Sequence, residues 1–383
     1  MNIYLDNAAT TPMRPEVIKT MTKTLQVFFG NPSSSHKLGR SARFAIENSR
    51  RTIAKLLNVR SAEIIFTSGG TEVNNLILTT VIQQLKVKRI ITSPIEHKSV
   101  LETSSQLFKN QGIILEFVKL KSHGRVDLED LENRLQNFSF TTLVSLMHAN
   151  NEIGNILPLK KVSAICKKYK AWFHSDTVQT IGHYKLNMQQ IGVDFASAGA
   201  HKFYGPLGVG FAFIRKGSLQ KGFIHGGVQE LGIRAGTENL YGIVAMAKAL
   251  ECSMQYLDKE HSVIEDLKKY AIFELKKAIP EVQFNGLSDN LQQSIYTILS
   301  ISLPIQDDVL HFCLDLKGIA VAQGSSCLSG IGLSSHVIHT ISEQENIKNK
   351  TTLRISLGRT NTKKDIDALI IALKECINTS NSL

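Results

Sequence analysis

Short β-branched segments alternate with longer helical patterns along the chain from about residue 63 onward. The strand-like segments are, in order, EIIFTS, RIITS, ILEFV, TTLVSLMH, AWFHSD, VDFASA and VGFAFI. Helical patterns over 69–85, 98–110 and 160–169 separate several of them. This alternation predicts an α/β fold, with a mostly parallel, doubly wound sheet of about seven strands in one large domain.

The pattern changes after an apolar helical segment at 237–256. The later strand-like segments YTILSISL and LRISL lie among helical patterns at 307–317 and 363–376. At 383 residues the chain exceeds the usual size of one hydrophobic core, so a second, smaller α+β domain is expected. We predict a large domain over 15–255 and a small domain formed by 1–14 and 256–383.

The chain is basic, with 44 Lys and Arg residues against 33 Asp and Glu residues and a formal net charge of +11. This balance favours anionic cofactors and acidic partners. The basic residues are spread along the chain and are not interleaved with aromatic residues, so we expect no direct nucleic-acid binding. No segment approaches the roughly 18 continuous apolar residues of a membrane span, and we expect a cytoplasmic protein.

The five cysteines are not arranged as a disulfide framework or a metal site. Their number is odd, and they form no CxxC pair and no Cys/His pair at metal-ligand spacing. We therefore expect reduced thiols and no bound metal. The cysteines are Cys166, Cys252, Cys313, Cys327 and Cys376.

Polar residues follow directly after most of the strand-like segments. Ligands of open α/β sheets bind at the carboxyl ends of the strands, so these residues are the candidates for a site. They are SGGTE at 68–72, Glu96 and His97, HANNE at 148–152, Asp176, and His201 and Lys202.

Each candidate also has a purely structural explanation. SGGTE precedes a helix, where backbone amides bind phosphate, but two glycines there more often form a tight turn. Asp176 either caps the following segment or keeps a ligand nitrogen protonated. His97, His148 and His201, taken singly, are more often satisfied polar residues at strand ends.

Lys202 follows Asp176 by roughly one strand–helix–strand unit, so both side chains can converge at neighbouring strand ends. A desolvated lysine amine is a nucleophile toward an aldehyde. A phosphate-binding turn, a ring-stacking histidine, an acid for a pyridine nitrogen and a lysine together predict a pyridoxal phosphate site.

The chain resembles cysteine desulfurases of the NifS/IscS type, in the class V aminotransferase group of fold-type I pyridoxal phosphate enzymes. The resemblance covers nearly the whole chain. It is carried by YLDNAATTP, FGNPSSSH, IIFTSGGTE, EHKSV, HANNEIG, HSDTVQTIG, AHKFYGPLGVG, GIRAGTEN, GSSC and RISLGR.

The resemblance implies a role for each matching residue. Lys202 would bond to the cofactor, His97 would stack on its ring, and Asp176 would pair with its pyridine nitrogen. Arg354, with Asn151 beside it, would bind the substrate carboxylate. The other implied cofactor contacts are Gln179 and Asn151 to the ring hydroxyl, Gly70, Thr71 and His201 to the phosphate, and Thr237 to the phosphate of the other subunit of a homodimer.

Cys327 would attack the sulfur of L-cysteine, hold it as a persulfide and pass it to an acceptor protein, such as an iron–sulfur scaffold or a sulfur carrier. Free cysteine is usually a small buried residue, but the glycines and serines around Cys327 predict an exposed, mobile loop. His97 would move a proton at the substrate thiol, and Lys202 would be the base at the α-carbon.

Three positions depart from the family pattern: Gly199 stands where most relatives have a serine that contacts the phosphate, and Val228 and Leu231 stand where Gly and Arg are usual.

Two other functions remain open. A selenocysteine lyase or another class V enzyme would use the same Lys202, Asp176 and His97, and a catalytically silent scaffold would keep only the fold.

Overall fold

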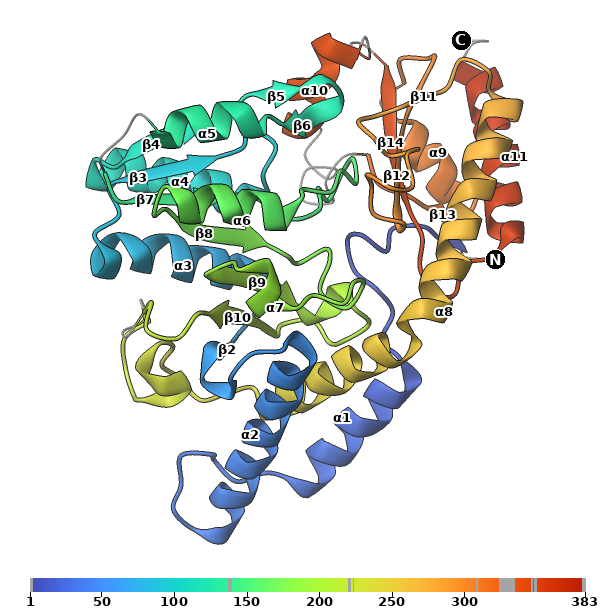
Figure 1. Cartoon of the computed structure of the whole chain (residues 1–383). Coiled ribbons are helices and arrows are strands. Elements are labelled where there is room, and N and C mark those ends of the chain that lie inside the picture. The colour runs from blue at the N-terminus through green and yellow to red at the C-terminus, as the bar shows by residue number, and fades with distance from the viewer. Residues whose placement is uncertain are drawn as a thin grey trace.

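A seven-stranded β-sheet forms the centre of the larger part of the molecule in the computed structural model (Figure 1). The structure describes residues 3–136, 140–219, 222, 224–307, 309–323, 335–345, 347 and 350–380. The strand order is β2 (Ile64–Thr67), β10 (Gly210–Ile214), β9 (Phe195–Gly199), β8 (Trp172–Asp176), β7 (Thr142–Ser145), β3 (Arg89–Thr92) and β4 (Ile114–Phe117). Each of the seven predicted strands is confirmed.

The sheet is mostly parallel, as predicted. β3 pairs in parallel with β4 and β7, and β8 pairs in parallel with β7 and β9. Only β10 runs antiparallel, to both β9 and β2. The connection between β9 and β10, at 200–209, contains no crossover helix. β10 therefore runs back beside β9 in the antiparallel direction.

Helices cover both faces of this sheet because successive strand residues point to opposite sides. In β2, Ile65 packs in the core under α3 (Gly70–Leu85) and α4 (Lys98–Gln111). Its neighbour Ile64 packs in the core of the other face. That face is covered by α2 (Lys37–Leu57), α5 (Leu128–Gln136), α6 (Leu159–Lys168), α7 (Met188–Ile191) and the first part of α8 (Leu240–Ala278).

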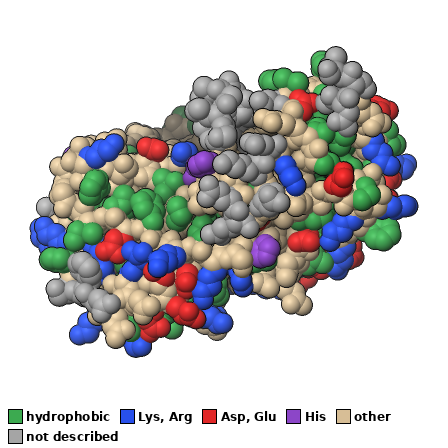
Figure 2. Space-filling view, turned by 90° about the horizontal axis from the view of Figure 1, so that it is seen from above, with side chains coloured by type: hydrophobic (Ala, Val, Ile, Leu, Met, Phe, Trp, Pro, Cys, Tyr) green, Lys and Arg blue, Asp and Glu red, His purple; other side chains and the backbone are tan. Residues whose placement is uncertain are grey.

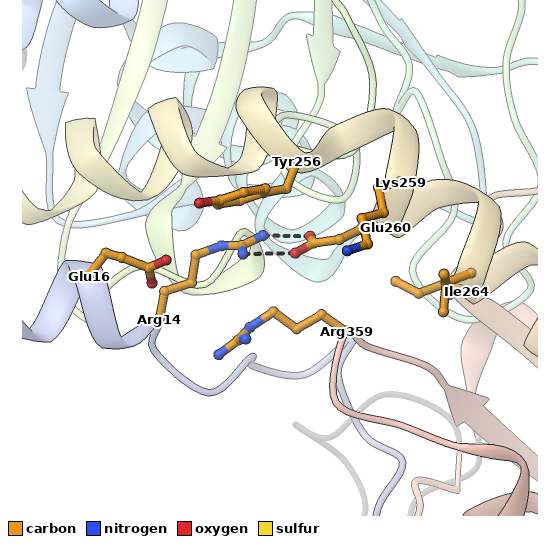
Figure 3. Close-up of a pocket in the computed structure, with 8 residues that line it drawn as sticks. Arg14, Glu16, Tyr256, Lys259, Glu260, Ile264 and Arg359 are labelled. Carbon is orange, nitrogen blue, oxygen red and sulfur yellow. Dashed lines mark hydrogen bonds and ion pairs between the residues drawn. The ribbon is translucent and has the colours of Figure 1, made fainter.

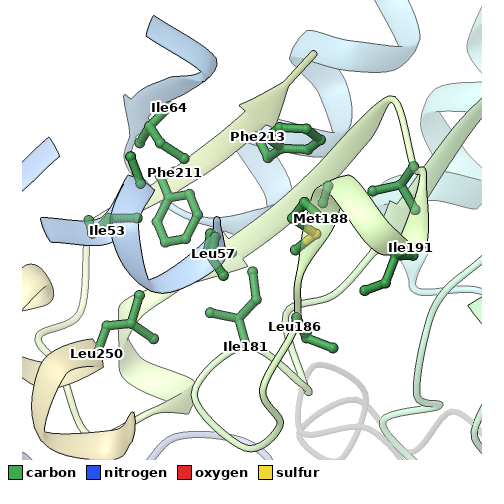
Figure 4. Packing of buried hydrophobic residues seen from close by; sticks show 14 of the residues in the cluster. Ile53, Leu57, Ile64, Ile181, Leu186, Met188, Ile191, Phe211, Phe213 and Leu250 are labelled. Carbon is green, nitrogen blue, oxygen red and sulfur yellow. The ribbon is translucent and has the colours of Figure 1, made fainter. Parts of the chain in front are cut away.

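Aromatic residues of β10 fill this second core. Phe211 and Phe213 lie on the same side of the strand, with Ile53 and Leu57 of α2 and Leu250 of α8 around them (Figure 4). Because both faces of the sheet are buried, its strands read as nearly continuous apolar segments in the sequence.

Helix α8 is much longer than the pattern at 237–256 predicted. It continues to Ala278 because no glycine or proline interrupts residues 243–279 and Pro280 follows. Its second part buries Ile264, Leu267, Ala271 and Leu275 in a separate core. The helix thus runs from the large sheet to the C-terminal part of the chain (Figure 1).

A smaller antiparallel sheet follows, which confirms the predicted α+β part. It contains β11 (Gln283–Phe284), β12 (Ile298–Leu303) and β14 (Thr351–Ser356), and it packs with α9 (Leu310–Leu316) and α11 (Lys363–Ser380). The remaining elements are α1 (Pro15–Val27), α10 (His336–Glu345), β1 (Ile3–Tyr4) paired with β13 (Ile319–Ala320), and β5 (Leu120–Lys121) paired with β6 (Arg125–Val126). The domain boundaries at 14/15 and 255/256 stay a prediction.

The expectation of reduced thiols is wrong for one pair of cysteines. Cys313 of α9 and Cys376 of α11 form a disulfide, with their Cα atoms 6.5 Å apart. The two helices pack against each other, which brings residues distant in sequence within bonding range. Cys166 and Cys252 are buried and free.

Charges of both signs are interspersed on the face seen in Figure 2, without an expanse of one sign. In the described part of the chain, no helix is long and apolar enough to cross a bilayer.

Candidate active site

A cavity of about 240 Å³ lies at the carboxyl ends of the central strands. Most of the residues predicted from the sequence meet there, although they come from segments hundreds of residues apart. Those lining it are Gly70, Thr71, His97, Asn151, Asp176, Gln179, His201, Lys202 and Arg354.

Lys202 lies in a short helical turn directly after β9. Its Nζ donates hydrogen bonds to the carbonyl oxygens of Ala8, at 2.6 Å, and Ala9, at 2.8 Å. Gln179 Nε2 donates to the same Ala8 oxygen at 3.1 Å. The N-terminal segment at Ala8 and Ala9 therefore lines the cavity and holds the Lys202 amine in position.

His97 caps the N-terminus of α4. Its Nδ1 accepts a hydrogen bond from the Ser99 backbone amide at 3.1 Å and lies 2.8 Å from Ser99 Oγ. Burial lowers the pKa of His97. The charge of Asp176 raises this pKa, and the charges of Lys202 and His336 lower it further. The imidazole is therefore neutral at pH 7, and its proton is assigned to Nε2 because Nδ1 is the acceptor.

Asp176 is 7% exposed at the end of β8. Its Oδ2 accepts from Asn74 Nδ2 at 2.8 Å, and its Oδ1 accepts from the Val178 amide at 3.0 Å. Asn74 Nδ2 also donates to Ser99 Oγ at 2.8 Å. The Asn74 side-chain amide thus orients both the Asp176 carboxylate and Ser99, which contacts His97.

Sequence reasoning missed Asn74. The signal that could have found it is its spacing of one helical turn after Gly70, which puts both residues on the same face of α3.

The start of α3 forms a cradle for an anion. Gly69 has φ 156° and ψ −178°, a conformation that essentially only glycine adopts. A Cβ on Gly70 would lie 2.5 Å from Val178 Cγ2, so this position requires glycine. His201 also lines the cavity, with its Nε2 edge toward this cradle: a Cβ built on Gly199 would lie 3.6 Å from His201 Nε2 and 3.7 Å from the Gly70 amide nitrogen. Burial lowers the pKa of His201 to about 4, so its neutral ring can donate one hydrogen bond to a phosphate group.

Gly199 ends β9 next to this cradle. A Cβ built there would lie 3.5 Å from His201 Cδ2 and 3.7 Å from the Gly70 amide nitrogen. Both are ordinary contacts, so the backbone would accept the larger serine side chain.

Arg354 lies on β14 and is 2% exposed. Its Nη2 donates to Asp6 Oδ1 at 2.6 Å and its Nη1 to the Asn151 carbonyl at 2.9 Å, while Nε is buried without a partner. Arg354 lines the cavity, so its guanidinium is the candidate group for binding a carboxylate there. Asp6, which orients the guanidinium, was not predicted from the sequence.

Several predicted residues lie elsewhere. His148 does not line this cavity; it bonds to Thr180 Oγ1 at 2.9 Å, and burial lowers its pKa to about 4, as a structural role requires. Thr237 is exposed and lines a separate small cavity with Ser68 and Gly208. Cys327 lies outside the described residues.

The two other departures lie on the surface. Val228 is 88% exposed, and Leu231 is 61% exposed with a φ of 58°, a left-handed conformation unusual for leucine. In the described part of the chain, no group of three His, Cys, Asp or Glu side chains is placed to hold a metal ion.

Known proteins are similar to this chain over nearly its whole length. The aminotransferase class-V family matches residues 3–369. A cysteine desulfurase IscS of Dictyoglomus turgidum is 43% identical, over 98% of this chain and 94% of the relative. A solved NifS-like protein is 36% identical with a TM-score of 0.90, covering 99% of this chain and 100% of its own. A structure of SspA in complex with cysteine is 29% identical, with a TM-score of 0.78 and coverage of 94% and 100%.

Proposed function

The chain belongs to the aminotransferase class-V family, and we propose on that premise that it is a pyridoxal-phosphate-dependent cysteine desulfurase, which converts L-cysteine to L-alanine. One observation carries this proposal. Lys202, Asp176, His97 and Arg354 line a single cavity, so an amine, an acid, a ring and a carboxylate-binding group are available together.

The residues present fit pyridoxal phosphate. The cradle at Gly70 and the His201 Nε2 edge beside it suit its phosphate, Asp176 suits its ring nitrogen, and Lys202 suits its aldehyde. When bound, the cofactor supplies a ring that takes up the electron pair released at the substrate α-carbon. Gln179 and Asn151 are the proposed contacts to its ring hydroxyl.

Three side chains handle the substrate. Arg354 binds the carboxylate of cysteine and thereby orients the α-carbon. Lys202 Nζ accepts the α-proton as a base. His97 Nε2 exchanges a proton with the substrate thiol, because its neutral imidazole can both donate and accept at pH 7.

Cys327 is the proposed nucleophile. Its thiolate forms a sulfur–sulfur bond with the substrate, the carbon–sulfur bond breaks, and its electron pair stays on the carbon side, which takes up a proton to give alanine. The sulfur remains on the enzyme as a persulfide for an acceptor protein.

The described residues on both sides of Cys327 are held at the site, which supports this role. Ala322 exchanges two backbone hydrogen bonds with Arg354, at 2.7 and 3.2 Å. On the other side, Ser335 Oγ donates to Glu152 Oε2, and His336 Nε2 donates to the Glu96 carbonyl at 2.9 Å. Cys327 follows Ala322 by five residues, and five residues of chain span at most about 17 Å, a distance compatible with a role at the cavity.

The test replaces Cys327 by serine. We expect alanine formation from cysteine to fall to background while the cofactor absorption band remains, because serine lacks a thiolate. Cys252→Ser, which changes a cysteine outside any disulfide, is the control and should remain active. Full activity of Cys327→Ser would overturn the assignment.

The same assay separates the alternatives. Faster alanine formation from selenocysteine than from cysteine would indicate a lyase, and no absorption band after adding cofactor would indicate a silent scaffold. The identity of the acceptor, whether an iron–sulfur scaffold or a sulfur carrier, and the cytoplasmic location stay predictions.

A further inference from the structure

A second cavity, of about 340 Å³, lies outside the active site. It forms where Arg14, which precedes α1, and Arg359, which follows β14, meet one face of α8 (Figure 3). The α8 residues that line it recur at helical spacing and are Tyr256, Lys259, Glu260, Val263 and Ile264. The desulfurase proposal assigns no role to this cavity.

The charge of Arg14 is already compensated inside the cavity. Its Nη1 and Nη2 donate to the two carboxylate oxygens of Glu260 at 2.8 and 2.5 Å, and its side chain is 3% exposed. Figure 3 shows this pair facing each other, with Tyr256 over the guanidinium and Arg359 below it. Arg14 therefore shapes the cavity but has little charge left for a ligand.

Arg359 is not compensated. Its guanidinium carbon lies 5.6 Å from the centre of the Tyr204 ring, and its Nε is buried without a hydrogen-bond partner. Among the described residues, no carboxylate pairs with Arg359 or with the exposed Lys259. The enclosed Nε is out of reach of a ligand, so Nη1 and Nη2, which make no hydrogen bond to the described residues, are the donors that a ligand oxygen in the cavity would meet.

The other residues that line the cavity determine which kind of anion would fit it. Beyond the Arg14–Glu260 pair, the lining contains Arg359, Lys259 and the single carboxylate of Glu16, so one positive charge is left over. The apolar surface of Val263 and Ile264 would contact a hydrocarbon portion. A singly charged organic acid meets both conditions, whereas a doubly charged phosphate would be repelled by Glu16 and leave the apolar wall bare.

We propose that this cavity binds a small monocarboxylic acid, with its carboxylate on Arg359 and Lys259 and its hydrocarbon portion on Val263 and Ile264. The site touches the active-site region through Tyr204, which lies two residues after Lys202. Arg14 packs on the Tyr204 ring at 4.7 Å, and the Arg14 amide donates to the Tyr204 carbonyl at 3.2 Å. A bound acid would connect α8 to the segment after β14 and stabilise the folded protein.

The test measures the melting temperature of the protein, saturated with pyridoxal phosphate, against increasing butyrate, acetate or inorganic phosphate. We expect butyrate to raise the melting temperature saturably, with acetate and phosphate weaker. In Arg359→Gln the half-saturating butyrate concentration should rise by about tenfold or more, the loss typical of a charged hydrogen bond. Lys109→Gln removes an exposed positive charge at the end of α4 and should bind butyrate as the unchanged protein does.

Three results would overturn the proposal. The first is the absence of a saturable butyrate effect, and the second is tighter binding of phosphate than of butyrate. The third is an unchanged butyrate response in Arg359→Gln, which would place butyrate on Arg354 in the active site instead. None of these results depends on turnover of cysteine, so failure here is distinguishable from failure of the desulfurase assignment.

Discussion

Single side chains at this site act mainly by orienting other side chains. Asn74 connects Asp176 to Ser99, and its Oδ1 in turn accepts from Ser197 Oγ. Ser197 Oγ lies 3.0 Å from Nε2 of the fully buried His174. Such a buried network is favourable only if every member is satisfied, so it holds the Asp176 carboxylate in one orientation.

Gly199→Ser tests the departure from the family pattern. The backbone at Gly199 is extended, and a Cβ there makes only ordinary contacts, so serine adds a hydroxyl beside the phosphate cradle without strain. We expect the dissociation constant of pyridoxal phosphate for the apoprotein to fall about fivefold, the value of one added hydrogen bond. Gly199→Ala, which adds the Cβ alone, should bind as the unchanged protein does; equal affinities of the two variants would contradict the prediction.

Lys268 makes the stability of the protein pH-dependent. It is fully buried in α8, where Nζ donates to Ser294 Oγ at 2.8 Å and to the Ile295 carbonyl at 2.9 Å. Burial lowers its pKa to about 7, whereas the unfolded chain keeps the ordinary value near 10.4. Between these values the unfolded state binds more protons, so stability rises with pH by roughly 1 kcal/mol per pH unit.

The measurement compares the free energy of unfolding of the wild type and Lys268→Met at pH 7 and pH 9. The wild type should gain about 2 kcal/mol relative to the variant over this interval. Lys109→Met, on the exposed end of α4, is the control and should follow the wild type. Parallel pH profiles for the wild type and Lys268→Met would refute the prediction.

At the scale of elements, helix N-termini and strand ends assemble the site. α3 presents the anion cradle, α4 presents His97, and α10 begins at the residues that hold the far side of the Cys327 segment. β14 contributes both Arg354 and the backbone bonds to Ala322. β14 therefore carries the proposed carboxylate-binding arginine and also bonds to the chain just before the segment that contains the proposed nucleophile.

Ser335→Ala tests the attachment at α10. Ser335 Oγ donates to Glu152, and it also accepts from the Ile338 amide at 3.1 Å. Without the bond to this carboxylate, the Cys327 segment is less restrained, and we expect kcat for alanine formation to fall about tenfold with the cofactor absorption unchanged. Ser342→Ala in the same helix, where Oγ donates to the His339 carbonyl at 2.8 Å, should keep its kcat. A kcat loss shared by both variants would indicate a general effect on α10.

At the scale of the whole molecule, one exposed projection carries several large apolar side chains. α1, α2 and the segment between them extend from the body of the protein (Figure 1), and their exposed residues are Ile18, Leu25, Val27, Phe29, Leu38 and Phe44. Phe29 is 73% and Phe44 65% exposed. We predict that this projection forms part of the interface of the expected homodimer, because exposed apolar surface is typical of interaction sites.

Phe29→Asp combined with Phe44→Asp should convert the dimer to a monomer in sedimentation velocity, because each change buries a charge in the interface. The pyridoxal phosphate affinity should fall as well, since Thr237 is expected to reach the cofactor of the other subunit. Phe108→Asp, at a 53% exposed position on α4, is the control and should stay dimeric. A monomeric wild type, or a double variant that stays dimeric, would contradict the prediction.

Local patterns in the sequence were sufficient to predict the seven strands, the smaller α+β part, and the candidate residues Lys202, Asp176 and His97, whereas Arg354 was implied by the family resemblance alone. Strand alternation and strand-end position are short-range properties, so they can be read without a structure. Only the tertiary structure decided that Asn74 orients Asp176, that Asp6 and Ala322 bond to Arg354, and that Cys313 bonds to Cys376. These pairings join segments far apart in sequence, and they depend on how helices and sheets pack rather than on any local periodicity.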